Sequence, residues 1–106
     1  FDKVDAVISP STPTIAFPAE WPSPSNDPRQ PFEHIAYTVP WNMGEQPAIS
    51  LNAGFSSPET SPALAANMPI GVQLIGPRFD DHFVLKLAHQ LATRLALPLR
   101  WPMLPA

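Results

Sequence analysis

Several residue types are scarce or missing in this sequence of 106 residues, and each absence excludes a class of function. There is no cysteine, which excludes a disulfide framework and a thiolate site and leaves the redox compartment open. Six Lys and Arg residues stand against nine Asp and Glu residues, and the net charge of -3 gives no reason to expect binding to nucleic acid or to an anionic membrane. No apolar run approaches the roughly 20 residues that span a bilayer.

Glycine is also rare, and its four residues (Gly44, Gly54, Gly71 and Gly76) are scattered singly. They form no phosphate-binding loop, and no serine stands in a Gly-x-Ser-x-Gly elbow. Neither a His-x-x-x-His pair nor a cysteine pair indicates zinc. The sequence therefore predicts no metal and no cofactor, and His82 and His89 are expected on the surface of a helix.

Proline is in excess, with sixteen residues, of which eleven lie in positions 1–62. Interior prolines break helices, so this half of the chain is not expected to be mostly helical. Residues 10–33 show no period, and we expect a loop that wraps a larger body. The first residue is Phe1 rather than Met, which suggests a processed or shortened chain.

The remaining sequence predicts three strands, two short helical turns and one long helix. A short buried strand is expected at 3–9, a helical turn at 33–37 and a short helix at 41–45 with Pro40 in its first turn. Clean alternation predicts strands at 47–55 and 69–75, paired antiparallel through a loop at 56–67. The joined strand pair spans 47–76.

The long helix is predicted at 81–96, with Asp80 and Asp81 at its start. Its apolar stripe contains Phe83, Val84, Leu87, Ala88, Leu91, Ala92 and Leu95. We expect this stripe to pack on the strand face that carries Ile49, Leu51, Val72 and Leu74. Because so few elements cannot hide all the apolar surface, the chain is interpreted as one edge of a larger α/β sheet.

Four runs, each weak alone, form an ordered pattern: Val4-Asp5-Ala6-Val7-Ile8-Ser9-Pro10, Gln46-Pro47-Ala48-Ile49-Ser50, Pro69-Ile70-Gly71-Val72-Gln73 and Phe79-Asp80-Asp81. In this order and spacing, they resemble the C-terminal end of the amidase signature family, whose members cleave carboxamides. The resemblance departs from the family pattern at Asn42–Gln46 and in the longer 56–67 loop. It implies an α/β fold, in which residues 1–106 form the C-terminal segment of a mixed sheet with an antiparallel strand pair and a long C-terminal helix.

The same resemblance implies a triad of a serine nucleophile, a second serine in a cis peptide and a buried neutral lysine, all upstream of this segment. Such a lysine needs desolvation to lower its pKa. Lys3 and Lys86 are both expected in solvent, and the chain has no glycine- and serine-rich signature. No catalytic residue is therefore assigned here. A hidden Ser-His-Asp triad is a weaker alternative.

Substrate-binding residues are expected in one block: Ile35, Tyr37, Thr38, Trp41 and Asn42. The resemblance implies that this stretch approaches the substrate cleft. Thr38 and Asn42 would orient an amide, and Tyr37 and Trp41 would line an acyl pocket. The alternative is that Asn42 caps a helix and the aromatic residues belong to the core. In amidotransferase A subunits an aspartate stands where this chain has Ile35, so the sequence favours a general amidase for an uncharged or apolar amide.

The leading hypothesis is thus part of a cytoplasmic amide hydrolase that is inactive as this chain alone. An A subunit of a tRNA-dependent amidotransferase and a non-catalytic binding module are the alternatives. The expected partners are a small-molecule amide, the remainder of the amidase chain and a second copy in a homo-oligomer, with no nucleic acid and no membrane.

Overall fold

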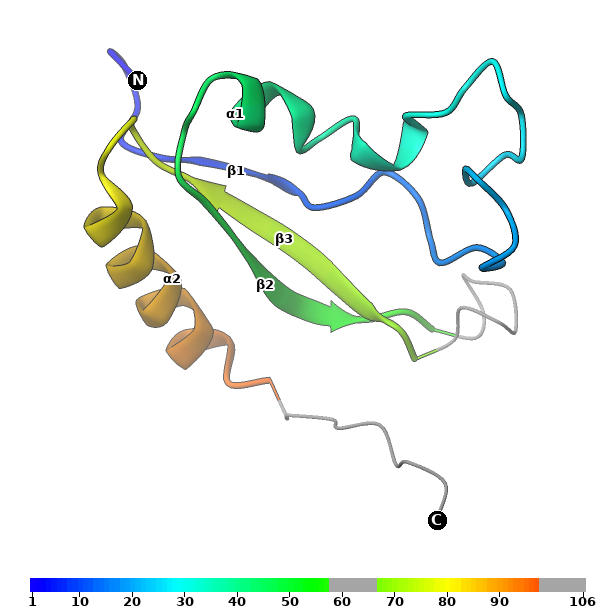
Figure 1. Ribbon diagram of the computed structural model, residues 1–106. Coiled ribbons are helices and arrows are strands. Elements are labelled where there is room, and N and C mark those ends of the chain that lie inside the picture. The colour runs from blue at the N-terminus through cyan, green and yellow to red at the C-terminus, as the bar shows by residue number, and fades with distance from the viewer. Residues whose placement is uncertain (58–66, 98–106) are drawn as a thin grey trace.

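The structure is a computed structural model that describes residues 1–57 and 67–97 (Figure 1). In these residues the elements are, in order, β1 (Val7–Pro10), the 3-10 helix η1 (Glu33–Ile35), α1 (Val39–Met43), β2 (Ala48–Phe55), β3 (Pro69–Ile75) and α2 (Asp81–Leu95). The strands predicted at 47–55 and 69–75 and the helix predicted at 81–96 are confirmed. Residues 58–66 of the predicted loop and the tail from residue 98 lie outside the described residues.

The sheet has the strand order β1-β3-β2, with β3 in the centre and both pairs antiparallel. The predicted antiparallel pairing of β2 with β3 is confirmed, with one irregularity between Asn52 and Gly54. The mixed sheet expected from the resemblance is not present in the described part. Both β1 and β2 are antiparallel to β3. A parallel neighbour would need a crossover connection instead of a simple reversal of the chain.

The two faces of the sheet differ in polarity, because directly opposed residues share a face. Ile49 lies opposite Leu74 on the apolar face, and Ser50 lies opposite Gln73 on the polar face. Leu74 is buried and Ile49 half-buried, whereas Ser50 is exposed. Helix α2, which contacts β2 and β3, therefore covers the apolar face, as the sequence predicts (Figure 1).

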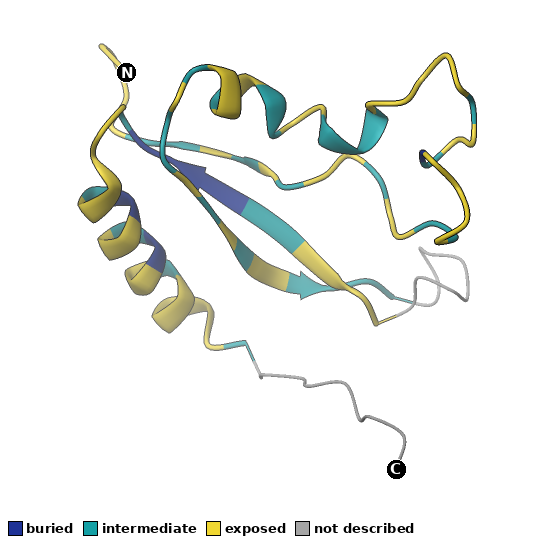
Figure 2. Cartoon of the chain, in the orientation of Figure 1, coloured by how far each residue is buried: buried dark blue, intermediate teal, exposed yellow. Residues whose placement is uncertain are grey.

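Helix α2 begins where the sequence predicts it, because the Asp80 side chain accepts a hydrogen bond from the Phe83 backbone N–H at 3.3 Å. It ends at Leu95, and the next residue, Ala96, takes a left-handed conformation. Figure 2 shows the buried stripe on its inner side, which is formed by Val84 and Ala88. The prediction is wrong for the C-terminal part of the stripe, because Ala92 and Leu95 are exposed. Helix α2 therefore carries apolar surface that the described residues do not cover.

The first strand is shorter and more exposed than predicted. It spans Val7–Pro10 instead of 3–9, and Ile8 is 63% exposed. The register gives the reason, because Val7 pairs with Ile75, the last residue of β3. Residues 3–6 extend beyond that end and have no ladder to join.

Between β1 and η1, residues 11–32 contain neither helix nor strand, as the proline content predicts. Most of this segment is exposed, but Ser23 is buried, with 1% exposure (Figure 2). The two helical turns are confirmed, although α1 starts at Val39 rather than at 41, with Pro40 in its first turn. No helix in the described ranges is long and apolar enough to cross a membrane.

Candidate functional site

The five residues predicted to bind substrate all lie on the stretch that runs from η1 into α1. Ile35 ends η1, Tyr37 and Thr38 form the connection, and Trp41 and Asn42 lie within α1. In Figure 1 this stretch and α2 lie on opposite sides of the sheet. We call residues 33–43 the η1–α1 segment.

Hydrogen bonds within the η1–α1 segment fix its shape. The Ile35 carbonyl accepts from the backbone N–H of Thr38 at 3.0 Å and from its hydroxyl at 3.1 Å. The Asn42 N–H donates to the Thr38 carbonyl at 3.1 Å. Since the Thr38 hydroxyl proton is used locally, this oxygen can offer a ligand only its acceptor lone pairs.

The alternative roles for this block are not what the structure shows. Asn42 lies inside α1 and does not cap it, and Thr38 at the N-cap position makes no side-chain cap hydrogen bond. Tyr37 is 42% exposed and Trp41 half-buried, so neither aromatic belongs to the fully buried core. Their surfaces remain open to a ligand or to another part of a protein.

One important residue was not singled out in the sequence: Gln73, in the centre of β3. It is only 4% exposed, and its Nε2 lies 2.6 Å from the Tyr37 carbonyl oxygen and 2.8 Å from Ser9 Oγ. Gln73 therefore joins β3, β1 and the η1–α1 segment. The sequence did contain a signal for its burial, namely a long amide side chain directly before two strongly apolar strand residues, Leu74 and Ile75.

The polar face continues away from Gln73 as a strip of hydroxyl groups. Ser11 Oγ and Ser50 Oγ lie 2.5 Å apart over Gly71. A Cβ atom at position 71 would lie 2.8 Å from Ser11 Oγ, closer than atoms normally approach. Glycine is needed here so that the Ser11 and Ser50 side chains can meet over β3.

A pocket of about 410 Å³ lies at the N-terminal end of β3, where Pro69, Ile70 and Gly71 line it. Its walls gather three large apolar residues that are exposed in this chain, Ile15, Met68 and Ile70, together with the hydroxyl-bearing Thr12 and Thr14. None of the five predicted site residues lines it. The structure thus separates the predicted block from this apolar pocket.

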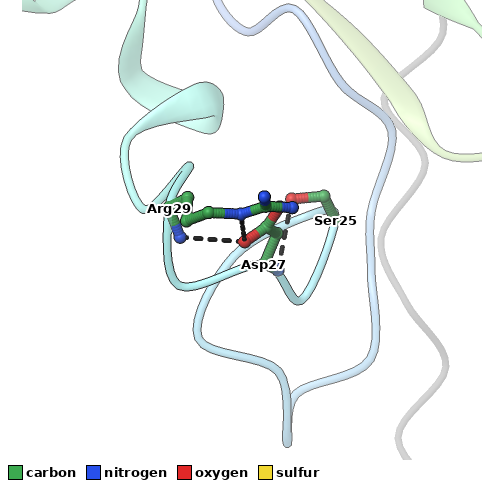
Figure 3. Close-up of polar contacts among 3 residues, drawn as sticks. All are labelled: Ser25, Asp27 and Arg29. Atoms are coloured by element: carbon green, nitrogen blue, oxygen red, sulfur yellow. Dashed lines mark hydrogen bonds and ion pairs between the residues drawn. The ribbon is translucent and has the colours of Figure 1, made fainter.

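Two ion pairs lie outside both the η1–α1 segment and the pocket. Figure 3 shows Asp27 of the proline-rich loop accepting from the Arg29 guanidinium at 2.8–3.1 Å and from its backbone N–H at 2.9 Å. These bonds hold the pKa of the Asp27 carboxyl below its usual range and raise the pKa of Arg29. A second ion pair joins Arg78 to Glu45. Both are surface pairs that shape loops.

The structure offers no support for a triad built from the residues it describes. The sheet serines Ser9, Ser11 and Ser50 hydrogen-bond to Gln73, to Pro10 or to one another. His82 and His89 are exposed on α2, whereas His34 packs against the Phe17 ring with centroids 5.9 Å apart. Both lysines are exposed. In the two described ranges, no group of three His, Cys, Asp or Glu residues could hold a metal ion.

Comparison with known proteins gives one consistent result. The family model described as Amidase matches residues 1–85. The A subunit of glutamyl-tRNA(Gln) amidotransferase from Sulfurihydrogenibium sp. is 38% identical over 90 residues, which are 85% of this chain and 16% of that protein. The A subunit from Halothermothrix orenii is 36% identical over 104 residues, which are 98% of this chain and 20% of that protein.

The A subunit from Desulforamulus reducens is 40% identical over 91 residues, which are 86% of this chain and 16% of that protein. The chain thus spans between a sixth and a fifth of the length of these relatives. No solved structure matches.

Proposed function

Because the chain belongs to the Amidase family, we propose that it is the C-terminal part of an enzyme that cleaves a carboxamide. The observation that carries this proposal is the family match over residues 1–85, combined with relatives five to six times longer than the matched segment. In the proposed enzyme the η1–α1 segment forms one wall of the substrate cleft. The nucleophile and the proton acceptor come from the rest of the protein.

The surface of the chain supports a role as part of a larger body. In the described ranges, the buried hydrophobic residues are only Leu74, Ile75, Val84 and Ala88. Large apolar residues on the surface include Ile8 at 63%, Met43 at 82% and Phe79 at 83% exposure. Burying such side chains contributes about 1.5–3 kcal/mol each, so a covering body would gain substantially from this surface.

The chemistry of the η1–α1 segment supports an uncharged or apolar amide as substrate. Ile35 is half-buried at the end of η1, two residues before the exposed Tyr37. An ammonium group placed against an aliphatic side chain would lose its hydration without gaining a partner. The Thr38 oxygen, with free lone pairs, can accept a hydrogen bond from the amide N–H of the substrate.

A second candidate is the amide-transfer reaction that the relatives are named for. The observation in its favour is that the relatives compared above are all named as A subunits of glutamyl-tRNA(Gln) amidotransferase. In this candidate the enzyme would work as one subunit of an assembly and would amidate glutamyl-tRNA(Gln). Ile35 argues against it, since the resemblance implies an aspartate at this position.

The experiment that separates these candidates starts from the full reading frame that encodes this chain. A lysine followed by a glycine- and serine-rich stretch upstream of residue 1 is expected. The purified enzyme should release ammonia or amine from a panel of apolar amides, without tRNA or a further subunit. Amidation of glutamyl-tRNA(Gln), with no cleavage of free apolar amides, would favour the second candidate.

The role of Ile35 is tested in the same enzyme by Ile35→Asp, with Ile35→Asn as the matched uncharged control. We expect Ile35→Asp to lower kcat/KM for apolar amides by at least about tenfold, because a carboxylate in the cleft must lose hydration. Ile35→Asn, of nearly the same shape, should lose less. Equal kinetics for the parent and both variants would place residue 35 outside the cleft.

A further inference from the structure

Gln73 is the residue whose hydrogen bonds reach furthest across the fold. Its Nε2 faces three acceptors: the Tyr37 carbonyl oxygen at 2.6 Å, Ser9 Oγ at 2.8 Å and the Pro10 carbonyl oxygen at 3.3 Å. Because carbonyl oxygens only accept, the atom that faces them must be the nitrogen of the side-chain amide. The Ser9 hydroxyl donates onward to the Pro10 carbonyl at 3.2 Å, which leaves its lone pairs for Gln73.

Both N–H groups of Gln73 are therefore committed, and the side chain is almost completely buried, at 4% exposure. Burial of an amide is costly unless its donors are satisfied. The segment that passes over Gln73 supplies the shortest of these bonds, through the Tyr37 backbone. The position of Tyr37 and the burial of Gln73 thus depend on each other.

The η1–α1 segment has no other hydrogen bond to the sheet in the part of the chain that the structure describes. Its remaining bonds are local, such as those from Thr38 and Asn42 to carbonyls three or four residues earlier. These local bonds fix the shape of the segment but not its distance from the sheet. The Gln73–Tyr37 bond is the hydrogen bond that ties the segment to the sheet.

We propose that Gln73 is a positioning residue that holds the η1–α1 segment in place and thereby sets the width of the substrate cleft. The inference rests on the proposed function for its catalytic consequence, but the clamp itself depends only on the hydrogen bonds described above. Small displacements of groups that position a substrate have large effects on rates and binding. Loss of the clamp should raise KM more than it lowers kcat, because the nucleophile is supplied by another part of the enzyme.

Three variants of the full-length enzyme test the clamp. Gln73→Met keeps the length of the side chain and removes both donors. Gln73→His keeps one N–H, at the same number of bonds from Cα. Ser9→Ala is the matched control, since it removes one of the two Gln73 partners on β1 and leaves the Tyr37 bond intact.

Two readouts are needed, hydrogen exchange and kinetics. In Gln73→Met, peptides covering residues 36–46 should exchange backbone hydrogens at least about tenfold faster, while peptides in α2 keep the parent rate. KM for an amide that the parent cleaves should rise about tenfold, with kcat changed less than about threefold. Gln73→His should recover part of both effects, and Ser9→Ala should stay within about twofold of the parent.

The outcomes separate this inference from the proposed function. If the parent cleaves no amide, the proposed function fails, and hydrogen exchange in residues 36–46 still decides whether the clamp exists. Equal acceleration of exchange in 36–46 and in α2 would make Gln73 a general stability residue and overturn the inference. Unchanged exchange in Gln73→Met, or a fall in kcat at constant KM, would also overturn it.

Discussion

Substitution of Leu74 by alanine tests the packing of α2 on the sheet. Leu74 is 1% exposed, lies on the apolar face of the central strand and pairs with Ile8 on one side and Ile49 on the other. Leu74→Ala removes three carbon groups from the most enclosed part of this face. The matched control is Leu85→Ala, which makes the same chemical change on α2 at a side chain that is 57% exposed.

The magnitude follows from this burial. Three carbon groups contribute roughly 2.4 kcal/mol of transfer free energy. The cavity left between the sheet and α2 adds to this, so the free energy of unfolding should fall by about 3–4 kcal/mol. Native proteins have total stabilities of roughly 5–15 kcal/mol, of which a loss of this size would be a large part. Leu85→Ala should change stability by less than about 0.5 kcal/mol, because alanine is also the better helix former.

Urea denaturation, followed by the circular dichroism of the helices, measures both changes. The midpoint of Leu74→Ala should fall by roughly 1.5–2 M relative to the parent, and that of Leu85→Ala should stay close to it. Equal stabilities for Leu74→Ala and the parent would show that α2 does not cover this face. A large loss in Leu85→Ala would show that the outer side of α2 is buried, and the orientation of the helix would be wrong.

Three further predictions follow from the same contacts. Gly76→Ala should destabilise the chain by about 1–3 kcal/mol in urea denaturation, since a Cβ atom there would overlap the Val84 side chain of α2; an unchanged midpoint would contradict this close approach. Because bonds from Arg29 hold the pKa of Asp27 below its usual range, they stabilise the loop above the unfolded-state pKa and lose this effect as the pH falls through the folded-state pKa. An NMR titration should show this step below the usual Asp range and lose it in Asp27→Asn; a titration at the ordinary Asp pKa would contradict the contact. The free 106-residue chain should self-associate, or residues 10–33 should be cut first in limited proteolysis, because sheet edges and apolar side chains are uncovered. A chain that is monomeric in light scattering and resistant to the protease would contradict this.

The main secondary structure could be predicted from the sequence because it depends on local patterns. Strict alternation placed β2 and β3, and the 3.6-residue period with Asp80 at its start placed α2. Their mutual packing followed, since Ile49, Leu51, Val72 and Leu74 share one face of the strand pair. These features are set by residues close together in the chain.

The length of β1 and the burial of Gln73 could not be predicted, because they depend on the relative positions of segments that are distant in the sequence. The length of β1 is limited by the end of β3 at Ile75, which no pattern within residues 3–9 contains. Gln73 has the polarity of a solvent-facing strand residue, but it is buried where it contacts Ser9 and Tyr37, which are distant in the sequence. In the same way, the stripe of α2 correctly marks Val84 as buried but cannot show that the described residues leave Leu95 uncovered.

Covalent labelling of the full-length enzyme tests most directly the claim that this chain is part of an amide-cleaving enzyme and does not carry its nucleophile. A serine-directed inactivator, such as a sulfonyl fluoride, is added until amide cleavage stops, and the labelled peptide is located by mass spectrometry. We predict one labelled serine, upstream of residue 1 in the same reading frame, and no stoichiometric label on the sheet serines Ser9, Ser11 and Ser50. Stoichiometric labelling of any serine within residues 1–106, in parallel with loss of activity, would contradict the account.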